Sequence, residues 1–283
     1  MNLTNGRKRL YLLLALALLT VLHPRVAAGG EKIPVAVTIL PQAYFVERLG
    51  GKYVDVRVLI PKGVSEEAYE PTAQQLIAFS RARIYVKIGQ EAFPAEKKFL
   101  RILSEKLATV EVVGFPEDIK KIKDDPHIWL SPTAVKKLAP KISQALIGID
   151  PQNKSYYENN LSQFLKDIEG MVSRIKTILV GKEGRSFLVY HPGWGYFAAE
   201  FGLKQMAIEK DGKPASALHL RRIVEEAKEK RIDVIFVQRG FDAKGARTVA
   251  QEIKGQVIEV DPLEKDWLNN LQNFAAKLKL AIR

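Results

Sequence analysis

Short runs of β-branched residues alternate with longer amphipathic runs through the first half of the chain. After an N-terminal apolar segment, this pattern predicts strands and helices in strict alternation. The predicted strands are 33–39, 53–60, 84–88 and 109–113, and the predicted helices are 42–49, 72–80 and 95–107. Thr72 and Gln75 form a capping box at the start of the second helix. Strands that alternate with helices predict a parallel sheet covered by helices on both faces.

A single long helix is predicted near the middle of the chain. Asp150 is a suitable N-cap, and Pro151 suits the first helical position. Apolar residues then recur at spacings of three and four residues from Tyr157 to Leu179, and Gly181 ends the pattern. At 1.5 Å per residue the predicted helix is a rod of roughly 45 Å, which is longer than one small lobe.

The alternation resumes in the second half and repeats the order of the first. The predicted strands are 186–190, 204–208, 234–237 and 257–260, and the predicted helices are 196–201, 217–230, 243–253 and 267–283. The sequence therefore predicts an α/β fold of two pseudo-symmetric lobes, each a four-stranded parallel sheet with flanking helices, joined by one long rigid helix. In this prediction residues 29–149 form the N-terminal lobe, 150–181 the connecting helix and 182–283 the C-terminal lobe.

Residues 1–28 have the pattern of a secretory signal peptide. Arg7, Lys8 and Arg9 precede an apolar run over 10–22, and Val26-Ala27-Ala28 offers small residues for cleavage. The apolar run is too short to span a bilayer, so an uncleaved membrane anchor is the weaker alternative. We expect export of the protein, with cleavage after Ala28.

The chain contains no cysteine. A disulfide framework, a thiolate metal site and a lipid-modified cysteine are therefore all excluded. An exported protein without a lipid anchor diffuses freely, and we expect it in a periplasm. The composition, with 47% hydrophobic and 27% charged residues, is typical of a folded globular protein.

The net charge is basic but does not indicate nucleic acid as a partner. Removal of residues 1–28, which carry four basic and no acidic residues, lowers the formal charge from +12 to +8. Lysine and glutamate are mixed along predicted helices, for example over 225–231, rather than gathered with aromatic residues into a stripe. This mixture is typical of a solvated helix face.

Side chains that can bind a metal follow several predicted strands. Glu66 and Glu67 follow the second strand and His127 follows the fourth, while His191 and Asp261 come directly after strands of the second half. In parallel α/β sheets the binding crevice lies outside the carboxyl ends of the strands. Glutamate, two histidines and aspartate form a ligand set for a borderline divalent cation where no thiolate is available.

Each candidate also has a plain structural explanation. His127 could pack a loop against the core with Trp129, and His191 could begin a tight turn. Asp261 could be a turn residue or an N-cap, and the two adjacent glutamates, Glu66 and Glu67, could be solvated. Their joint placement in both lobes favours a shared metal site.

The segment around His127 is rigid, because Pro126 and Pro132 fix their own φ angles and restrict the residues before them. The two remaining histidines are not candidates. His219 begins a predicted helix rich in basic residues and is expected on the surface, and His23 is removed with the signal peptide.

Several motifs resemble those of the zinc- and manganese-binding receptors of ABC transporters. The matching segments are 63–72, 125–132 (Asp-Pro-His-Ile-Trp-Leu-Ser-Pro), 190–197 (Tyr-His-Pro-Gly-Trp-Gly-Tyr-Phe), 201–203, 261–263 and the helix opening from Asp150 to Asn160. The resemblance covers the whole mature chain. That periplasmic family has two α/β lobes joined by one long helix.

The resemblance implies that Glu67, His127, His191 and Asp261 are the metal ligands. In the family a histidine usually stands two residues before the tyrosine of the first segment, and here that position holds Glu67, with Glu66 as the alternative ligand. The histidine-rich acidic loop of many zinc receptors is absent, because 116–125 is short and contains lysines instead.

The function that the resemblance implies is that of a periplasmic receptor, not an enzyme. It binds a divalent metal ion between its lobes, zinc first and manganese as the second choice, and delivers it as a monomer to an ABC permease in the inner membrane. One alternative is a receptor for a metal chelate such as a siderophore or haem, with Trp129, Trp194 and Tyr196 around an aromatic pocket. The other is an exported metallohydrolase, which requires an open coordination position on the metal.

Overall fold

The N-terminal half of the chain folds around one parallel sheet. The computed structural model describes residues 31–89, 93–106, 110–123, 125–209, 216–239 and 244–282. The predicted signal peptide lies outside the described residues, and residues 32–283 form one compact unit. The described helices include none that has both the length and the apolar character needed to cross a bilayer.

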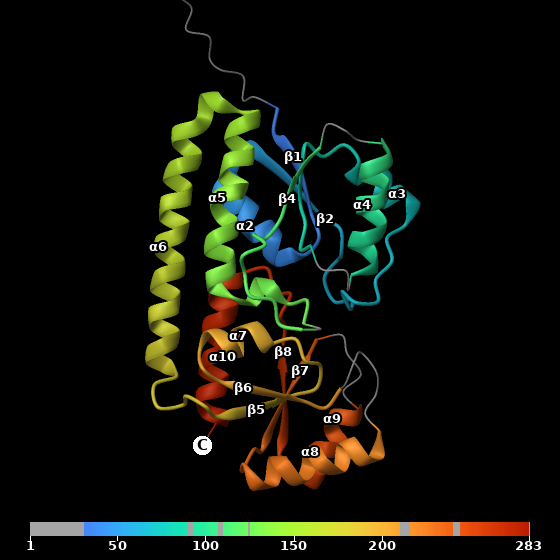
Figure 1. Cartoon of the computed structure of the whole chain (residues 1–283), viewed down its shortest axis with the longest axis vertical. Coiled ribbons are helices and arrows are strands. Elements are labelled where there is room, and N and C mark those ends of the chain that lie inside the picture. The colour runs from blue at the N-terminus through green and yellow to red at the C-terminus, as the bar shows by residue number, and fades with distance from the viewer. Residues whose placement is uncertain are drawn as a thin grey trace, which may run out of the picture. The chain divides into compact units, whose positions relative to one another are not determined.

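The first sheet has the strand order β2-β1-β3-β4, and every neighbouring pair is parallel. Its strands are β1 (Ile33–Val37), β2 (Val54–Val58), β3 (Ile84–Val86) and β4 (Glu111–Val113). The helices of this half are α2 (Leu40–Gly50), α3 (Ala73–Phe79) and α4 (Pro94–Lys106). Helix α2 lies on one face of the sheet, and α3 and α4 lie on the other (Figure 1). The predicted capping box is confirmed, because Thr72 Oγ1 accepts a hydrogen bond from the Gln75 backbone N–H at 3.2 Å.

The second half repeats this arrangement with the strand order β6-β5-β7-β8, again all parallel. Its strands are β5 (Ser186–Val189), β6 (Lys204–Ala207), β7 (Val234–Gln238) and β8 (Gln256–Val260). Its helices are α7 (Gly195–Glu200), α8 (Ala217–Glu229), α9 (Lys244–Glu252) and α10 (Trp267–Ala281). The predicted fold class, two α/β lobes with four-stranded parallel sheets joined by a long helix, is confirmed.

Successive residues along the strands of the second sheet point to its two opposite faces. Phe187 and Phe236 pack against Phe274 of α10, with ring centroids 5.8 and 5.4 Å apart. Their neighbours Leu188 and Ile235 belong instead to the core under α8 and α9. This division follows from the two-residue period of a strand, and burial on both faces explains why β7 is apolar almost throughout.

The long helix begins later than the sequence predicts. A 3₁₀ turn (η3, Pro151–Asn153) precedes α6 (Lys154–Ile178). Asp150 does not cap a backbone N–H of the helix; its Oδ2 accepts hydrogen bonds from Asn153 Nδ2 and from the Tyr157 hydroxyl, both at 2.7 Å. Asp150 therefore links the side chains of Asn153 and Tyr157 by hydrogen bonds across the first turns of the helix.

A second long helix, α5 (Pro132–Ile149), is not predicted from the sequence; it lies beside α6 (Figure 1). Pro132 occupies its start, and Ser131 Oγ accepts a hydrogen bond from the Ala134 N–H at 3.1 Å. Pro140 lies inside the helix and removes one backbone hydrogen bond, which is why the sequence does not indicate a helix here. Burial of a complete apolar face outweighs that loss; its members include Val135, Leu138, Ile142 and Leu146.

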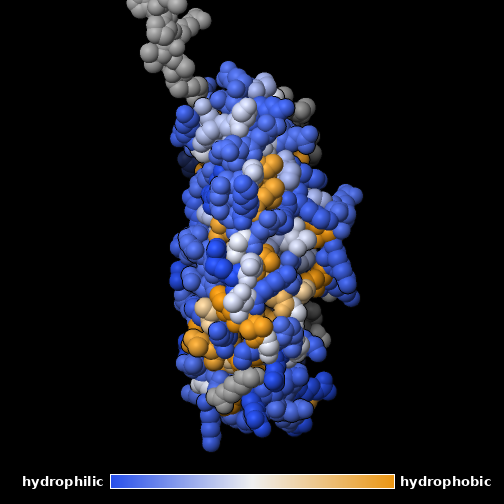
Figure 2. All heavy atoms as spheres, turned by 90° about the vertical axis from the view of Figure 1, so that its left-hand side faces the viewer, coloured by the Kyte–Doolittle hydropathy of each residue, from blue (hydrophilic) through white to orange (hydrophobic). Residues whose placement is uncertain are grey.

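The core between the lobes contains aromatic side chains, and the surface on the α6 side of the molecule is polar. Phe45 of α2 meets Trp267 of α10 edge to face, with centroids 5.2 Å apart. Helix α6 buries one face, which includes Phe164 and Met171. The side of the molecule that carries α6 presents mainly hydrophilic side chains, with hydrophobic ones in smaller groups (Figure 2). This is the pattern expected of an amphipathic helix packed on a core.

Two indole groups join the central 3₁₀ turn η2 (Ile128–Leu130) to the C-terminal half. Trp129 Nε1 donates to the Pro262 carbonyl at 2.9 Å, and Trp267 Nε1 donates to the Trp129 carbonyl at 2.8 Å. Both indoles are fully buried. These hydrogen bonds hold the segment that carries His127 in a fixed position against the C-terminal half.

Candidate metal site

Three buried side chains converge between the two lobes: Glu66, His127 and His191. Each offers one ligand atom, and these atoms lie within 4.8 Å of one another. The residues are 0%, 1% and 4% exposed, respectively. Across the part of the chain that the structure describes, this is the one group of three or more side chains suited to a metal ion. Ionisable groups this deeply buried are costly unless they are paired or bind a metal.

Glu66 and Glu67 lie in the loop between β2 and α3, at the carboxyl end of the N-terminal sheet. Glu66 is fully buried, and its Oε1 lies 3.2 Å from His127 Nε2. The Glu67 side chain is 28% exposed, with its Oε1 3.4 Å from His191 Nε2. Burial raises the pKa of Glu67, but the hydrogen bond to His191 and the charges of both histidines outweigh burial and lower it. The structure thus places both glutamates beside histidines, with Glu66 in the more central position.

His127 is oriented by a carboxylate of its own segment. Asp125 Oδ1 accepts the backbone N–H of His127 at 2.9 Å and lies 2.8 Å from its Nδ1. A carboxylate at Nδ1 fixes the proton there and turns Nε2 towards Glu66, an arrangement common for metal-binding histidines. Burial lowers the pKa of His127, but the hydrogen bonds to Asp125 and Glu66 outweigh it and raise the pKa from 6.5 to about 10.

His191 has the same kind of support from the other lobe. It follows β5, and its Nδ1 lies 2.7 Å from Glu209 Oε2. Burial lowers the pKa of His191, but the hydrogen bonds to Glu209 and Glu67 raise it above its ordinary value. The rings of His127 and His191 lie 5.3 Å apart, nearly edge to face. Each lobe therefore presents one histidine backed by a carboxylate.

The sequence analysis did not single out Asp125, Glu209 or Gln238 as site residues. Gln238 ends β7, and its Nε2 donates to both oxygens of Glu66, at 3.2 and 3.0 Å. Glu209 follows β6 and Gln238 closes β7, so a search for every polar residue at a strand end would have found both. Asp125 stands in the Asp-Pro-His motif, two residues before His127.

Glycine at 193 permits the close approach of the two histidines. A Cβ atom on Gly193 would lie 3.2 Å from His127 Nε2 and 3.5 Å from His191 Cδ2. A Cβ atom on Gly195 would collide with Asp125 Oδ2. The small residues of the His-Pro-Gly-Trp-Gly segment thus leave room for the site and for the carboxylate that orients it.

Asp261 is not part of the three-residue group. Its Oδ1 accepts the Leu263 N–H at 2.9 Å, and its carbonyl accepts Asn270 Nδ2 at 2.7 Å. Burial raises the pKa of Asp261 above its ordinary value. Its role as a ligand stays a prediction.

His219 also lies outside the group. It is half-buried rather than exposed, and its Nε2 lies 3.3 Å from the Ala207 carbonyl.

The aromatic residues that a chelate receptor would place around its ligand are packed in the core. Trp129, Trp194 and Tyr196 are 0%, 2% and 4% exposed. Trp194 stacks on Phe274 with centroids 3.6 Å apart. Among the described residues these rings are closed off from solvent, and Trp129 packs beside His127 of the candidate site.

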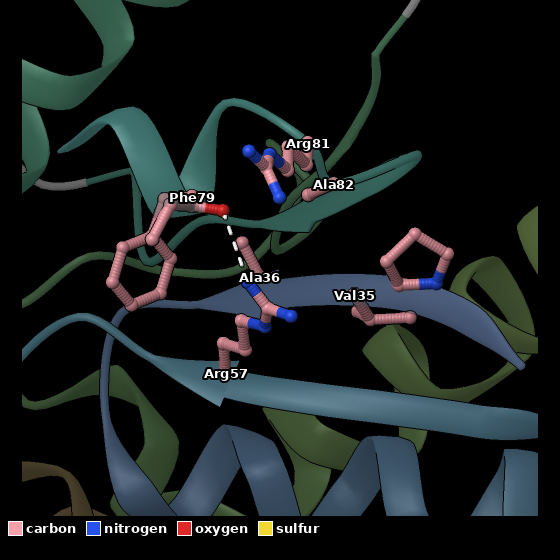
Figure 3. Close-up of a pocket in the computed structure, with 8 residues that line it drawn as sticks. Val35, Ala36, Arg57, Phe79, Arg81 and Ala82 are labelled. Carbon is pink, nitrogen blue, oxygen red and sulfur yellow. Dashed lines mark hydrogen bonds between the residues drawn. The ribbon is translucent and has the colours of Figure 1, made fainter. Parts of the chain in front are cut away.

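A hollow at the edge of the N-terminal sheet offers no metal ligands (Figure 3). It lies between β1, β2 and the end of α3, where Arg57 Nη1 donates to the Ala78 carbonyl at 3.3 Å. Its described lining contains neither histidine nor carboxylate. The site between the lobes therefore remains the candidate.

Known proteins are similar to this chain in sequence and in fold. The family model of the zinc-uptake complex component A, periplasmic, matches residues 35–281. The high-affinity zinc uptake system protein ZnuA of Bacillus subtilis is 28% identical over 255 residues, which cover 83% of this chain and 80% of the relative. The manganese ABC transporter substrate-binding lipoprotein PsaA of Streptococcus anginosus is 24% identical over 248 residues, 80% of this chain and 78% of the relative.

Solved structures that resemble this chain point to the same family as these relatives. A crystal structure of ZnuA has 37% sequence identity and a TM-score of 0.83, and the match covers 89% of this chain and 99% of that chain. The Zn(II)-bound ZnuA-like domain of Streptococcus pneumoniae AdcA has 25% identity and a TM-score of 0.74, with 88% of this chain and 98% of that chain covered.

Proposed function

Because the chain belongs to the family of periplasmic component A of zinc-uptake complexes, we propose that it captures a divalent metal ion between its lobes and delivers the ion to an ABC permease. The observation that carries this proposal is the convergence of Glu66, His127 and His191 in a buried position that both lobes supply. Ligands from both lobes mean that the ion, once bound, holds the cleft shut.

Zinc is the expected cargo, and manganese is the second candidate. Two imidazoles with carboxylates form a ligand set that suits zinc, and an unselective site of this kind binds zinc more tightly than manganese. The relatives include proteins named for zinc and for manganese. Glu66, His127 and His191 form the centre of the proposed ligand set. Glu67, which lies beside His191, and Asp261 are the candidates for the fourth ligand, and Asp261 would exchange its contact with the Leu263 N–H for the ion.

Binding of the ion displaces protons from the histidines. The pKa of His127, raised to about 10, means that this ring is protonated at neutral pH before the ion arrives, and the pKa of His191 is raised above its ordinary value. Coordination requires the neutral ring. Asp125 and Glu209 remain on the Nδ1 side, where they keep Nε2 of each ring directed at the ion.

The protein is proposed to act outside the cytoplasm as a monomer. The basic and apolar pattern of residues 1–28 supports export with cleavage after Ala28, and the absence of cysteine excludes a lipid anchor on that residue type. The partner is an ABC permease of the inner membrane. No catalytic step is proposed, because protein ligands from both lobes leave no open position on the metal.

Metal analysis and competition test this proposal. Protein purified without added metal is expected to contain zinc, and zinc is expected to displace manganese in an equilibrium titration. The double variant His127→Ala/His191→Ala should lose zinc affinity by at least a hundredfold, while His219→Ala should not change it. Unchanged affinity in the double variant would show that the ion binds elsewhere.

A further inference from the structure

We propose that Gln238 is a positioning residue that restricts Glu66 to one-oxygen coordination and so favours zinc over manganese. This inference rests on the proposed function, because it concerns selectivity at the same site. Three observations support it: the geometry of the amide, the burial of both partners, and an amide oxygen that has no hydrogen-bond donor among the described residues.

The amide of Gln238 contacts both oxygens of Glu66. Nε2 lies 3.2 Å from Oε1 and 3.0 Å from Oε2, so it is nearly equidistant from the two. A metal ion that binds a carboxylate through both oxygens must also lie nearly equidistant from them. Gln238 Nε2 therefore occupies the side of Glu66 from which an ion would be chelated, and only the remaining lone pairs are available to the ion.

Oε1 of Glu66 also faces His127. Oε1 lies 3.2 Å from His127 Nε2. An ion between Glu66, His127 and His191 then receives one oxygen from Glu66 and one nitrogen from each ring. Zinc accepts such a set, because it prefers few ligands in a tetrahedral arrangement. Manganese prefers a larger number of oxygen ligands, so the loss of the second carboxylate oxygen weakens its binding more.

The contact joins the two lobes in a buried setting. Gln238 ends β7 of the C-terminal sheet and is 5% exposed, while Glu66 belongs to the N-terminal lobe and is 0% exposed. Water cannot replace the amide freely at such a position. Gln238 is also uncharged, so it holds the carboxylate without supplying a positive charge that would compete with the ion.

Neither packing nor the hydrogen bonding of its Oε1 atom explains why residue 238 is a glutamine. Its Oε1 is buried and has no hydrogen-bond partner among the residues that the structure describes. A buried acceptor without a donor is destabilising, and such groups are uncommon in folded proteins unless they have a functional role. A leucine would fill a similar volume without that cost. The contact of Nε2 with Glu66 is what distinguishes glutamine from leucine here.

The test compares zinc and manganese affinities of the purified protein and of Gln238→Leu by competition titration at one pH. We expect the variant to lose zinc affinity by about tenfold or more, the usual effect of removing a group that orients a metal ligand. Manganese affinity should change by less than about threefold, so the zinc-to-manganese ratio falls. X-ray absorption at the metal edge should show an additional oxygen on the metal in the variant.

Gln42→Leu is the matched control. Gln42 is also a fully buried glutamine, and its Oε1 accepts the Thr38 N–H at 2.9 Å and the Ile39 N–H at 3.2 Å. Its replacement should lower stability and leave the zinc-to-manganese ratio unchanged. If Gln238→Leu does not fold, Gln238→Met, which is unbranched, serves in its place.

The possible results distinguish a failure of the role given to Gln238 from a failure of the proposed function. If the unaltered protein binds neither metal, the proposed function is wrong. If it binds metal but the Gln238 variants keep the same ratio, or lose both affinities by the same factor, the selectivity role of Gln238 is wrong while the proposed function stands.

Discussion

Gly193 has no side chain, yet it shapes the candidate metal site as directly as the proposed ligands do. It follows His191 by two residues and lies against both histidine rings. Its backbone N–H donates to the His191 carbonyl at 2.8 Å, which closes a tight turn. The turn brings the C-terminal lobe close to His127 Nε2, the atom that would bind the ion.

Gly193→Ala should weaken zinc binding although it removes no ligand. The added Cβ would lie 3.2 Å from His127 Nε2 and crowd the position of the ion. We expect a loss of about tenfold in affinity, equivalent to about 1.4 kcal/mol, measured by competition titration. Gly170→Ala is the control, because its Cβ would meet only Arg174 Nη1 at 3.6 Å. That change should leave affinity unchanged and add about 0.5–1 kcal/mol of stability within helix α6. If Gly193→Ala and Gly170→Ala bound zinc with equal affinity, the added Cβ at position 193 would not crowd the ion.

The two adjacent glutamates should differ in their effect on the ion. Glu66 is fully buried between His127 and Gln238, whereas Glu67 is partly exposed beside His191. Glu66→Gln should therefore reduce zinc affinity by roughly a hundredfold and Glu67→Gln by only a few-fold, since charged ligands in buried sites contribute more. Both variants keep the side-chain volume. The reverse order, measured in the same titration, would make Glu67 the principal carboxylate ligand, as the resemblance to the family implies.

At the scale of elements, the joint between α5 and α6 depends on Asp150. Its Oδ2 accepts the hydroxyl of Tyr157 and the amide of Asn153, both at 2.7 Å. Burial raises the pKa of Asp150, but these hydrogen bonds outweigh it and lower the pKa below its ordinary value. The carboxylate form therefore stabilises the fold.

Asp150→Ala should destabilise the protein by about 1–3 kcal/mol at pH 7, as expected when hydrogen bonds to a charged group are lost. Urea unfolding measures the difference. The folded pKa lies below the unfolded value, so the contribution is fully present above the unfolded pKa and is lost as the pH falls through the folded pKa. The two proteins should become equally stable in acid. Zinc affinity should not change, and a persistent stability difference at low pH would show that the carboxylate charge is not the cause.

The same elements show what the sequence predicts and what it cannot. The positions of the strands along the chain follow from local periodicity, which is why every predicted strand is found near its expected range. The order of the strands within each sheet does not follow from periodicity and was not predicted. Helix α5 was missed because Pro140 signals a break, while the decisive contribution is burial against α2 and α6, which only the tertiary structure reveals. The rule that binding residues follow strands located His127 and His191. Glu209, which supports His191, is 18 positions away from it, and Gln238, which supports Glu66, is 172 positions away from it, so proximity in sequence does not indicate them.

At the scale of the whole molecule, the two lobes are joined by contacts that do not depend on the ion. Trp129 Nε1 donates to the Pro262 carbonyl and Trp267 Nε1 donates to the Trp129 carbonyl across the junction, and Phe45 packs on the Trp267 indole. Capture of the ion therefore requires only a limited movement of the cleft walls. The main change on binding is chemical, because coordination requires neutral histidine rings and the pKa values of His127 and His191 are both raised.

Zinc affinity should rise with pH between 6 and 8. His127 has a pKa raised to about 10, and the pKa of His191 is also raised, so each ring must release a proton before its Nε2 can bind the ion. One released proton changes the apparent affinity by about tenfold per pH unit and two protons by about a hundredfold. Calorimetric titration in two buffers with different ionisation enthalpies counts the protons directly. We expect between one and two protons released per zinc ion in the unaltered protein and about one in His191→Ala, because only His127 then titrates. A titration without proton release would mean that the rings are already neutral, and then neither carboxylate, Asp125 nor Glu209, raises the pKa of its histidine in solution.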